Sequence, residues 1–239
     1  NVVLNNGKKI PADLVICNAD PPTVYSEMLP PEYSRDSLLK PKKFTHYSMG
    51  LYVLFFGSKK KFSDVAHHTI WMSERYKELL HDIFEKKILT EDFSLYLHRP
   101  TATDDTFAPE GCDSFYVLCP VPNLQGNVQW NSEGPKLKDR IVEALDKTIM
   151  PGLKENIEAE FWMTPEDFKN DYRSKYGAGF SVAPIFSQSA WFRYHNKDKK
   201  IPNLYFSAAG SHPGAGIPGV LCSAKVIEKL IIKDFKVSH

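Results

Sequence analysis

A glycine-rich stretch near the carboxyl end has the residue types and spacing of a nucleotide-binding loop. Gly214-Ala215-Gly216-Ile217-Pro218-Gly219 matches the pattern G-x-G-x-x-G and lies between a predicted strand and a predicted helix. Glycine lets the backbone approach a ligand closely, and the first turn of a helix offers unpaired N–H groups to an anion. Pro218 suits that first turn, where its missing N–H is not needed. The stretch therefore predicts an anion-binding loop, with a glycine-rich connector that binds nothing as the alternative.

The position of this loop argues against an ordinary dinucleotide fingerprint. Such a fingerprint opens a βαβ unit of about 30 residues and needs an acidic residue about 20 positions further on. Only 20 residues follow Gly219. We therefore expect a terminal strand–loop–helix that packs onto a Rossmann-like unit supplied by another part of a longer protein.

The elements that position the loop alternate irregularly between strands and helices. The opening residues predict a hairpin around Asn6-Gly7 that ends in a strand at 14–17 buried on both faces. The pattern of apolar residues then predicts strands at 48–56, 68–72, 94–98, 114–119, 157–163 and 203–209. Helices are expected at 76–84 with Ser73 as cap, around 137–149 with Pro135 in the first turn, and from Thr164 to near Gly177. A further helix is expected after Gly219, with a buried face of Val220, Leu221, Ala224, Ile227, Leu230 and Ile231. This order predicts an α+β or α/β fold with a mixed, largely antiparallel sheet and helices over one face.

Composition excludes several classes of protein. The chain has 30 Lys+Arg and 29 Asp+Glu, so it lacks the basic excess of a nucleic-acid-binding protein. No stretch supplies the roughly 20 predominantly apolar residues of a transmembrane helix. The four cysteines follow no metal or disulfide spacing, and the eight histidines contain no H-E-x-x-H motif. We therefore predict free thiols and no metal site, and we interpret His67-His68 as an ordinary pair in a strand.

Ala209 to Gly219 resembles the closing motif of bacterial-type phytoene desaturases, the FAD-dependent carotenoid desaturase family. Further segments from about Ala12 to about Leu230 are similar in the same order, among them Ala66-His67-His68-Thr69, Arg75-Tyr76-Lys77-Glu78-Leu79, Glu91-Asp92-Phe93-Ser94-Leu95-Tyr96-Leu97-His98, Ala108-Pro109-Glu110-Gly111-Cys112, Glu133-Gly134-Pro135-Lys136-Leu137 and Gln188-Ser189-Ala190-Trp191-Phe192-Arg193. The resemblance implies that this chain is the C-terminal half of a longer enzyme. Residues 1–22 and 196–239 would be returning pieces of an incomplete FAD-binding Rossmann-like domain, and 23–195 would be the substrate-binding domain.

The resemblance also implies a chemistry and a site. Family members introduce double bonds into a carotenoid precursor such as phytoene by hydride transfer to FAD, and the reduced flavin is reoxidised by a quinone or oxygen. Phe180, Trp191 and Phe192, with the segment 50–56, are candidates for lining an apolar substrate tunnel. The cofactor-binding residues would be Gly210, Ser211, His212, Pro213, Gly214, Ala215, Gly216, Ile217, Pro218 and Gly219. No catalytic residue or oligomeric state is assigned, Ser211-His212 could instead cap the loop, and the chain alone is expected to bind FAD poorly and to be inactive.

Three other functions stay open at this point. They are a related FAD-dependent polyene isomerase, a retinol saturase-like reductase, and a carotenoid-binding module without catalysis. A substrate that dissolves in lipid implies a cytoplasmic enzyme that contacts a membrane peripherally without crossing it. Three lysine clusters are interpreted as solvated loops, at Lys40/Lys42/Lys43, Lys59 to Lys61 and Lys197/Lys199/Lys200. The second is flanked by Phe55, Phe56 and Phe62, which makes it the candidate for contact with an anionic bilayer.

Overall fold

The computed structural model describes residues 1–33 and 45–236, which form two compact units. The first unit contains residues 1–48, 172–175 and 180–239, and the second contains 49–171 and 176–179. Residues 180–195 lie in the same compact unit as residues 210–219. The expected division into segments 1–22, 23–195 and 196–239, with the functions assigned to them, stays a prediction.

The second unit is built on a five-stranded antiparallel sheet with the strand order β5-β6-β7-β4-β8. The central strand β7 alternates between buried and half-buried residues, as expected of a sheet with one covered face, whereas the first five residues of its neighbour β4 are all buried. The strands predicted from apolar patterning are confirmed to within a few residues, as β4 (Gly50–Ser58), β5 (His68–Trp71), β6 (Leu95–His98), β7 (Asp113–Val121) and β8 (Ile157–Met163).

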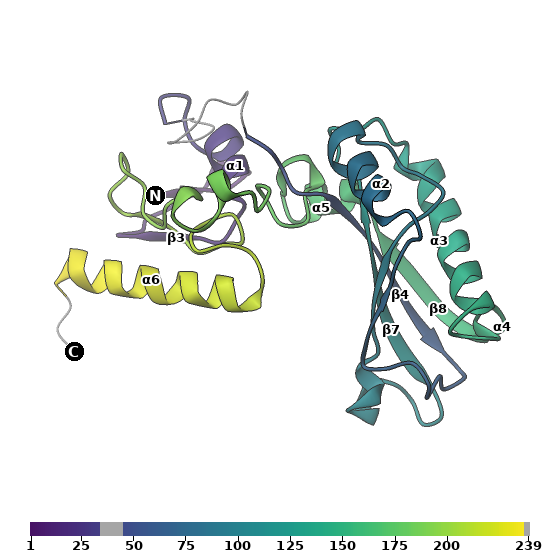
Figure 1. Cartoon of the computed structure of the whole chain (residues 1–239). Helices are drawn as coiled ribbons and strands as arrows, with labels where there is room; N and C mark the ends of the chain where they lie inside the picture. The colour runs from purple at the N-terminus through teal and green to yellow at the C-terminus, as the bar shows by residue number, and fades with distance from the viewer. Residues whose placement is uncertain (34–44, 237–239) are drawn as a thin grey trace. The chain divides into compact units, whose positions relative to one another are not determined.

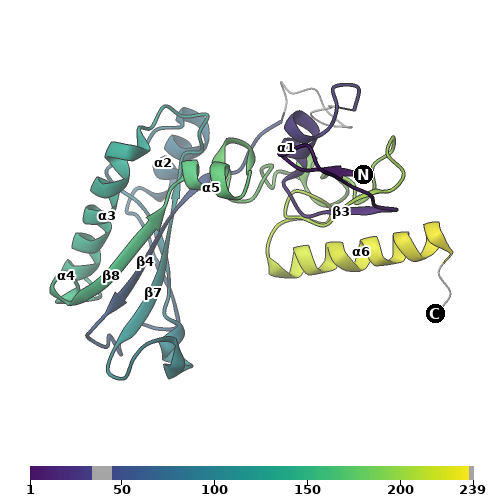
Figure 2. The same ribbon diagram turned by 180° about the vertical axis from the view of Figure 1, so that it is seen from behind.

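Helix α3 (Trp130–Lys147) covers one face of this sheet (Figures 1 and 2). Its stripe of Leu137, Ile141 and Leu145 is fully buried in the core that Tyr52 and Leu54 of β4 also enter. Shorter helical segments surround the sheet, namely α2 (Tyr76–His81) with a π-helical continuation at Asp82–Lys86, 3-10 turns at Pro100–Ala102 and Asp105–Phe107, α4 (Leu153–Asn156) and α5 (Pro165–Asp171). The expected arrangement of helices over an antiparallel sheet is confirmed.

The opposite face of the sheet carries a row of rings at one register position. His68 pairs with His98, His98 with Tyr116, Tyr116 with Phe55, and Phe55 with Phe161, so the row crosses all five strands. The Phe55 ring stacks on Phe161 at 4.5 Å between centroids and meets Tyr116 edge-on at 5.3 Å. Such contacts stabilise neighbouring strands beyond the area they bury. They also place two histidines at the β5 edge of the row.

The first unit is centred on two parallel strands, β3 (Val15–Cys17) and β9 (Leu204–Phe206). The predicted hairpin is confirmed as β1 (Val2–Val3) and β2 (Lys9–Ile10), with Gly7 at a φ of 81° in its turn. Helix α6 (Ile217–Phe235) follows β9 and lies beside β3 in both views (Figures 1 and 2). The remaining turns of this unit are α1 (Pro21–Thr23), a π-helical segment at Val24–Met28, and 3-10 turns at Phe186–Gln188 and Ala190–Phe192. A further 3-10 turn, Lys175–Gly177, contains residues of both units.

Three predicted helix boundaries are wrong. The helix predicted from Pro135 begins at Trp130, because the buried Trp130 ring stacks near Tyr52 and adds turns before the proline. Ser73 is not the cap of α2, which begins after Arg75, although its hydroxyl accepts the Arg75 N–H at 3.0 Å. The capping interaction at Thr164 is present, since its N–H donates to Asp167 at 2.6 Å, but α5 ends at Asp171 and not near Gly177.

Two predicted burial patterns also differ from the structure. Ile16 in β3 is about half exposed, and among the described residues β3 pairs with β9 alone. On α6 the buried positions are Ser223 and Ile227, whereas Leu221 and Ala224 are exposed. The apolar stripe of α6 is therefore wider than the surface that covers it within this unit.

Candidate functional site

The glycine-rich loop, defined as Gly210–Gly219, connects β9 to the first turn of α6. Gly216 caps the helix without any side-chain hydrogen bond and has a φ of 90°, and Gly214 has a φ of 149°. Nothing lies within 4 Å of the position that a side chain on Gly216 would occupy. At Gly219, by contrast, an added Cβ would lie 2.6 Å from the Gly214 carbonyl oxygen. Glycine is therefore required at Gly216 for its backbone conformation and at Gly219 for close packing.

Arg193 holds the segment before the loop in place. Its guanidinium is buried and donates to Ala209 O at 2.8 Å and to Phe180 O at 3.0 Å through Nη2. Nη1 donates to the carbonyl oxygens of Val182 and Gln188. Five N–H groups in a fixed fork suit such a cluster of carbonyls better than the single ammonium group of lysine. The sequence does not indicate that Arg193 binds these carbonyl groups, because its acceptors are spread over thirty residues of chain.

Asp20 lies beside the beginning of the loop. Its carboxylate accepts the Lys175 N–H at 2.9 Å and the Ser181 hydroxyl. Burial raises the pKa of Asp20, and the two hydrogen bonds and the neighbouring Arg193 only partly oppose that rise. An added Cβ on Gly210 would lie 2.6 Å from Ser181 Oγ and 3.0 Å from Asp20 Oδ1. The beginning of the loop is therefore packed directly against this buried acid.

His212 is fixed through its backbone and leaves a ring nitrogen without a partner. Its N–H donates to Tyr194 O at 2.8 Å, and its carbonyl accepts Asn196 Nδ2 at 2.8 Å. Nδ1 of His212 is buried and has no hydrogen-bond partner among the described residues. A buried polar atom of this kind calls for a ligand or water to satisfy it. It is the clearest local sign that the loop is built to meet another molecule.

The loop therefore fits the cofactor that the resemblance implies. The first turn of α6 has no side-chain cap to occupy its N–H groups, and the space beside Gly216 is open. Helix N-termini with glycine-rich approaches suit phosphate groups. The Ser211 hydroxyl is used differently, since it accepts the Ala208 N–H and donates to the Ala208 carbonyl. Ser211 thus caps the loop, as one of the two sequence interpretations expected.

Two of the three candidate substrate-lining residues are prominently exposed in the unit that holds the loop. Trp191 and Phe192 are 65% and 51% exposed, and Phe180 is half-buried. The Trp191 ring lies 6.0 Å from the His212 ring, edge to face, and Phe192 lies 5.9 Å from the exposed Phe186. An aromatic surface therefore adjoins the loop at His212.

The segment 50–56, also a candidate for lining a substrate tunnel, lies in β4, where alternate side chains point to opposite faces of the sheet. Tyr52, Leu54 and Phe56 point into the core of the second unit, and only the alternate residues, Phe55 among them, lie on the opposite sheet face. Phe56 and Phe62 are buried, so they are not available to enter a bilayer beside Lys59 to Lys61. That part of the membrane expectation is wrong. Lys40, Lys42 and Lys43 lie outside the described residues.

His98 lies next to His67 and His68, a cluster that the spacing of these residues in the sequence did not reveal. In residues 1–33 and 45–236, no helix combines the length and apolar character needed to cross a bilayer.

Comparison with known proteins places the chain in a family. Residues 1–226 match the family described as flavin containing amine oxidoreductase. The lycopene-forming phytoene desaturase of Pantoea ananas is 45% identical over 237 residues, covering 98% of this chain and 48% of the relative. The neurosporene-forming phytoene desaturase of Rhodobacter capsulatus is 44% identical over 236 residues, covering 95% and 44%. The chain thus spans about half the length of the curated relatives it matches.

A solved structure shares the fold. An oxidoreductase from Methanosarcina mazei superposes with a TM-score of 0.50 at 13% identity, covering 95% of this chain and 47% of that one. At such low identity the similarity concerns the fold alone. The family match over residues 1–226 is the decisive finding, and the chain belongs to the flavin containing amine oxidoreductase family.

Proposed function

We propose that this chain forms the C-terminal half of an FAD-dependent desaturase that introduces double bonds into a carotenoid precursor such as phytoene. The glycine-rich loop carries the proposal, because it combines an open helix N-terminus with the unpartnered Nδ1 of His212. The similarity to phytoene desaturases over nearly the whole chain supports the same conclusion.

Residues of the loop would hold the cofactor. The N–H groups at the start of α6 would bind a phosphate, and Gly214 and Gly216 would let the backbone approach it. Nδ1 of His212 would hydrogen-bond a polar group of the bound molecule. When bound, FAD supplies the hydride acceptor that no amino-acid side chain provides. Arg193 and Asp20 would act as positioning residues, because both lie against the beginning of the loop, at Ala209 and Gly210.

The parallel pair β3 and β9 would belong to a larger Rossmann-like sheet. Parallel strands occur almost only in sheets covered on both faces, and such a sheet needs more than two strands. Within the described residues β3 pairs with β9 alone, so its outer edge could accept a further strand. The exposed Leu221 of α6 and Ile16 of β3 are apolar surface of the kind that added elements would bury. The relatives, at about twice this length, have the additional chain for such elements.

Phe180, Trp191 and Phe192 would contact the carotenoid. A long polyene has no group to hydrogen-bond, so aromatic and apolar side chains must align it and exclude water. The closeness of Trp191 to His212 would bring that apolar surface to the cofactor side of the loop. We extend the proposal to peripheral contact with the cytoplasmic membrane surface, for which the exposed Phe186 and Trp191 are better candidates than Phe62. A quinone or oxygen would reoxidise the reduced flavin.

A chimera tests this function. The chain replaces the matching half of the Pantoea ananas relative, and the product is expressed in a bacterial host that accumulates phytoene. We expect extracted carotenoids with red-shifted absorption, because desaturation lengthens the conjugated system. A chimera that binds flavin and isomerises or saturates polyenes, or that retains carotenoid without flavin and without turnover, would contradict the proposal in favour of the rival functions.

A further inference from the structure

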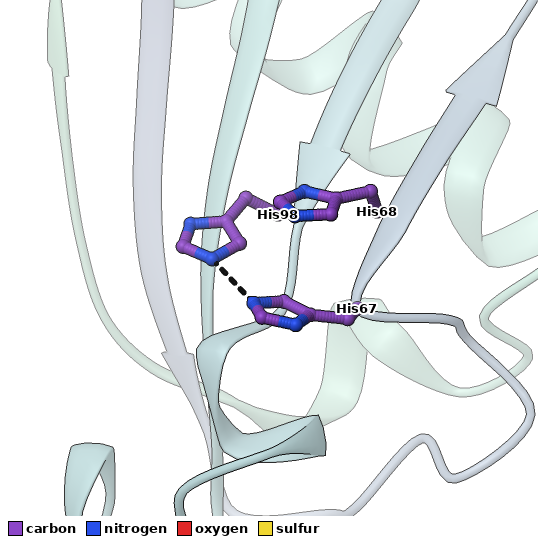
Figure 3. Close-up of side chains that lie close together, drawn as sticks. All are labelled: His67, His68 and His98. Carbon is purple, nitrogen blue, oxygen red and sulfur yellow. Dashed lines mark hydrogen bonds between the residues drawn. The ribbon is translucent and has the colours of Figure 1, made fainter. Parts of the chain in front are cut away.

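Three histidines meet at the free edge of the sheet in the second unit. His68 and His98 are register partners on β5 and β6, and β5 is the edge strand. His67 lies at a bend just before β5, where its carbonyl accepts the Arg99 N–H at 2.9 Å. Successive residues of a regular strand point to opposite faces, and the bend instead lets His67 join His68 on one face (Figure 3). We name His67, His68 and His98 the histidine cluster.

The ring nitrogens of this cluster are close enough to share one ion. One nitrogen from each ring lies within 4.8 Å of the other two. Nε2 of His67 and Nε2 of His98 are 2.9 Å apart (Figure 3). With metal–nitrogen bonds of roughly 2.0–2.1 Å, that separation corresponds to an angle of about 90° at the metal. Such an angle is typical of square-planar or octahedral coordination.

To bind one ion, the side chains of His67 and His68 would have to turn. The His67 and His68 rings are stacked at 4.3 Å between centroids, so each needs to turn about its own side-chain bonds to face a common point. His68 is exposed, and His67 and His98 are half-buried, which leaves room for the rotation and for water to complete the coordination shell. Imidazole is a ligand suited to copper, nickel and zinc.

Neighbouring groups favour imidazoles in the metal-binding state. Tyr96 Oη lies 2.8 Å from His68 Nδ1, and Thr103 Oγ1 lies 3.5 Å from His67 Nδ1. Metal-binding histidines usually donate their second ring N–H to such an oxygen, which fixes the tautomer. The nearest cation in sequence is neutralised, because Arg99 is buried and paired with Asp113 at 3.0 Å.

We propose that the histidine cluster binds one divalent transition-metal ion, Cu²⁺ most tightly, followed by Ni²⁺ and Zn²⁺. The ion would connect the bend before β5 and the edge strand itself to β6. Its site consists entirely of residues of the second unit, so it is distinct from the glycine-rich loop and independent of FAD. The alternative is that the three rings form an ordinary stacked and hydrogen-bonded group, as was expected of His67-His68.

Calorimetric titration of the 239-residue chain with CuCl₂ and ZnCl₂ tests this site. We expect one saturable ion per chain. H67Q, H68Q and H98Q should each weaken binding by more than about tenfold, since losing even a supporting hydrogen bond costs about 10–100-fold. H81Q, which removes an exposed histidine of α2 outside the cluster, should bind as the wild type does. Circular dichroism of the metal-free variants checks that they fold.

Electron paramagnetic resonance of the Cu²⁺-loaded wild-type chain gives a second readout that needs no variant. Coupling to several imidazole nitrogens is the expected spectrum. Binding that H98Q leaves unchanged, or a copper spectrum without imidazole coupling, would overturn the assignment, and so would the absence of saturable binding. Because FAD does not enter these measurements, their outcome is separate from that of the proposed function.

Discussion

Gly216 has a positive φ at the point where the glycine-rich loop enters α6. Its φ of 90° is one that residues with a Cβ adopt only with strain, although the space around it is open. We predict that G216A lowers the free energy of unfolding of the chain by roughly 1–2 kcal/mol. G111A is the matched control, because Gly111 has a φ of 80°, equally open surroundings and a position in the other unit. Urea denaturation should give similar losses for both, and a loss confined to G216A would show that the strain argument is incomplete.

Arg193 supports the loop through four carbonyl groups at once. We predict that R193M lowers the free energy of unfolding by roughly 3 kcal/mol, because several of these buried acceptors lose their donor. R193K should fall between R193M and the wild type, since lysine retains the charge without the planar fork. The measurement is urea denaturation followed by tryptophan fluorescence.

An exposed arginine provides the comparison for Arg193. The side chain of Arg173 is 55% exposed and forms a long ion pair of 3.6 Å with Glu27. R173M should therefore change the free energy of unfolding by less than about 0.5 kcal/mol. Equal effects of R193M and R173M would show that the carbonyl cluster contributes nothing to stability.

At the level of elements, the carboxylate of Asp234 links α6 to Tyr205 of β9. Asp234 accepts hydrogen bonds from Tyr205 Oη at 2.7 Å and from Lys197 Nζ at 2.6 Å. These bonds hold the pKa of Asp234 below its ordinary value of 3.8, and the same contact with burial raises the pKa of Tyr205 to about 12. An acid with a lowered pKa in the folded state stabilises the protein above its unfolded pKa and loses that contribution as the pH falls through the folded value.

D234N is therefore expected to be less stable than the wild type at neutral pH, and the difference should shrink as the pH falls below 3.8. Urea denaturation at neutral pH and at about pH 3 measures it. E228Q, on an exposed position of the same helix, serves as the control. A difference between D234N and wild type that stays constant with pH would contradict the assignment.

The elements were predictable where neighbours along the chain determine them. Runs of apolar residues located β4 and β7 to within a few positions, because strands that pack into a core are rich in such residues. The start of α3 was not predictable, because Trp130 is buried by Tyr52, a residue far away in sequence. The end of α5 was missed because Arg173 and Tyr176 adopt positive φ, which their residue types do not indicate.

The sequence likewise predicts one part of the candidate site and not the rest. The glycine-rich loop was visible from composition and spacing alone. The buried contacts of Asp20 with Ser181 and Lys175 were not, because these partners lie 161 and 155 residues away along the chain. The histidine cluster likewise depends on the register between β5 and β6, which no local pattern specifies.

At the scale of the whole molecule, the chain spans about half the length of the relatives it matches. The parallel pair β3 and β9 and the wide apolar stripe of α6 both present surface that this unit leaves uncovered. We predict that the isolated chain binds FAD weakly, because under the proposed function the loop would supply only one part of a dinucleotide site. Titration of the chain with FAD, followed by flavin fluorescence, measures this, and tight stoichiometric binding would contradict the shared site.

Whether the glycine-rich loop holds the cofactor is best measured by the flavin content of the purified chimera with the Pantoea ananas relative. We expect about one flavin per polypeptide for the chimera and for its G111A variant. It predicts loss of most of the flavin in G216A, although both substitutions impose similar backbone strain. A soluble chimera without flavin, or a G216A chimera that retains its full flavin content, would show that the glycine-rich loop does not hold the cofactor.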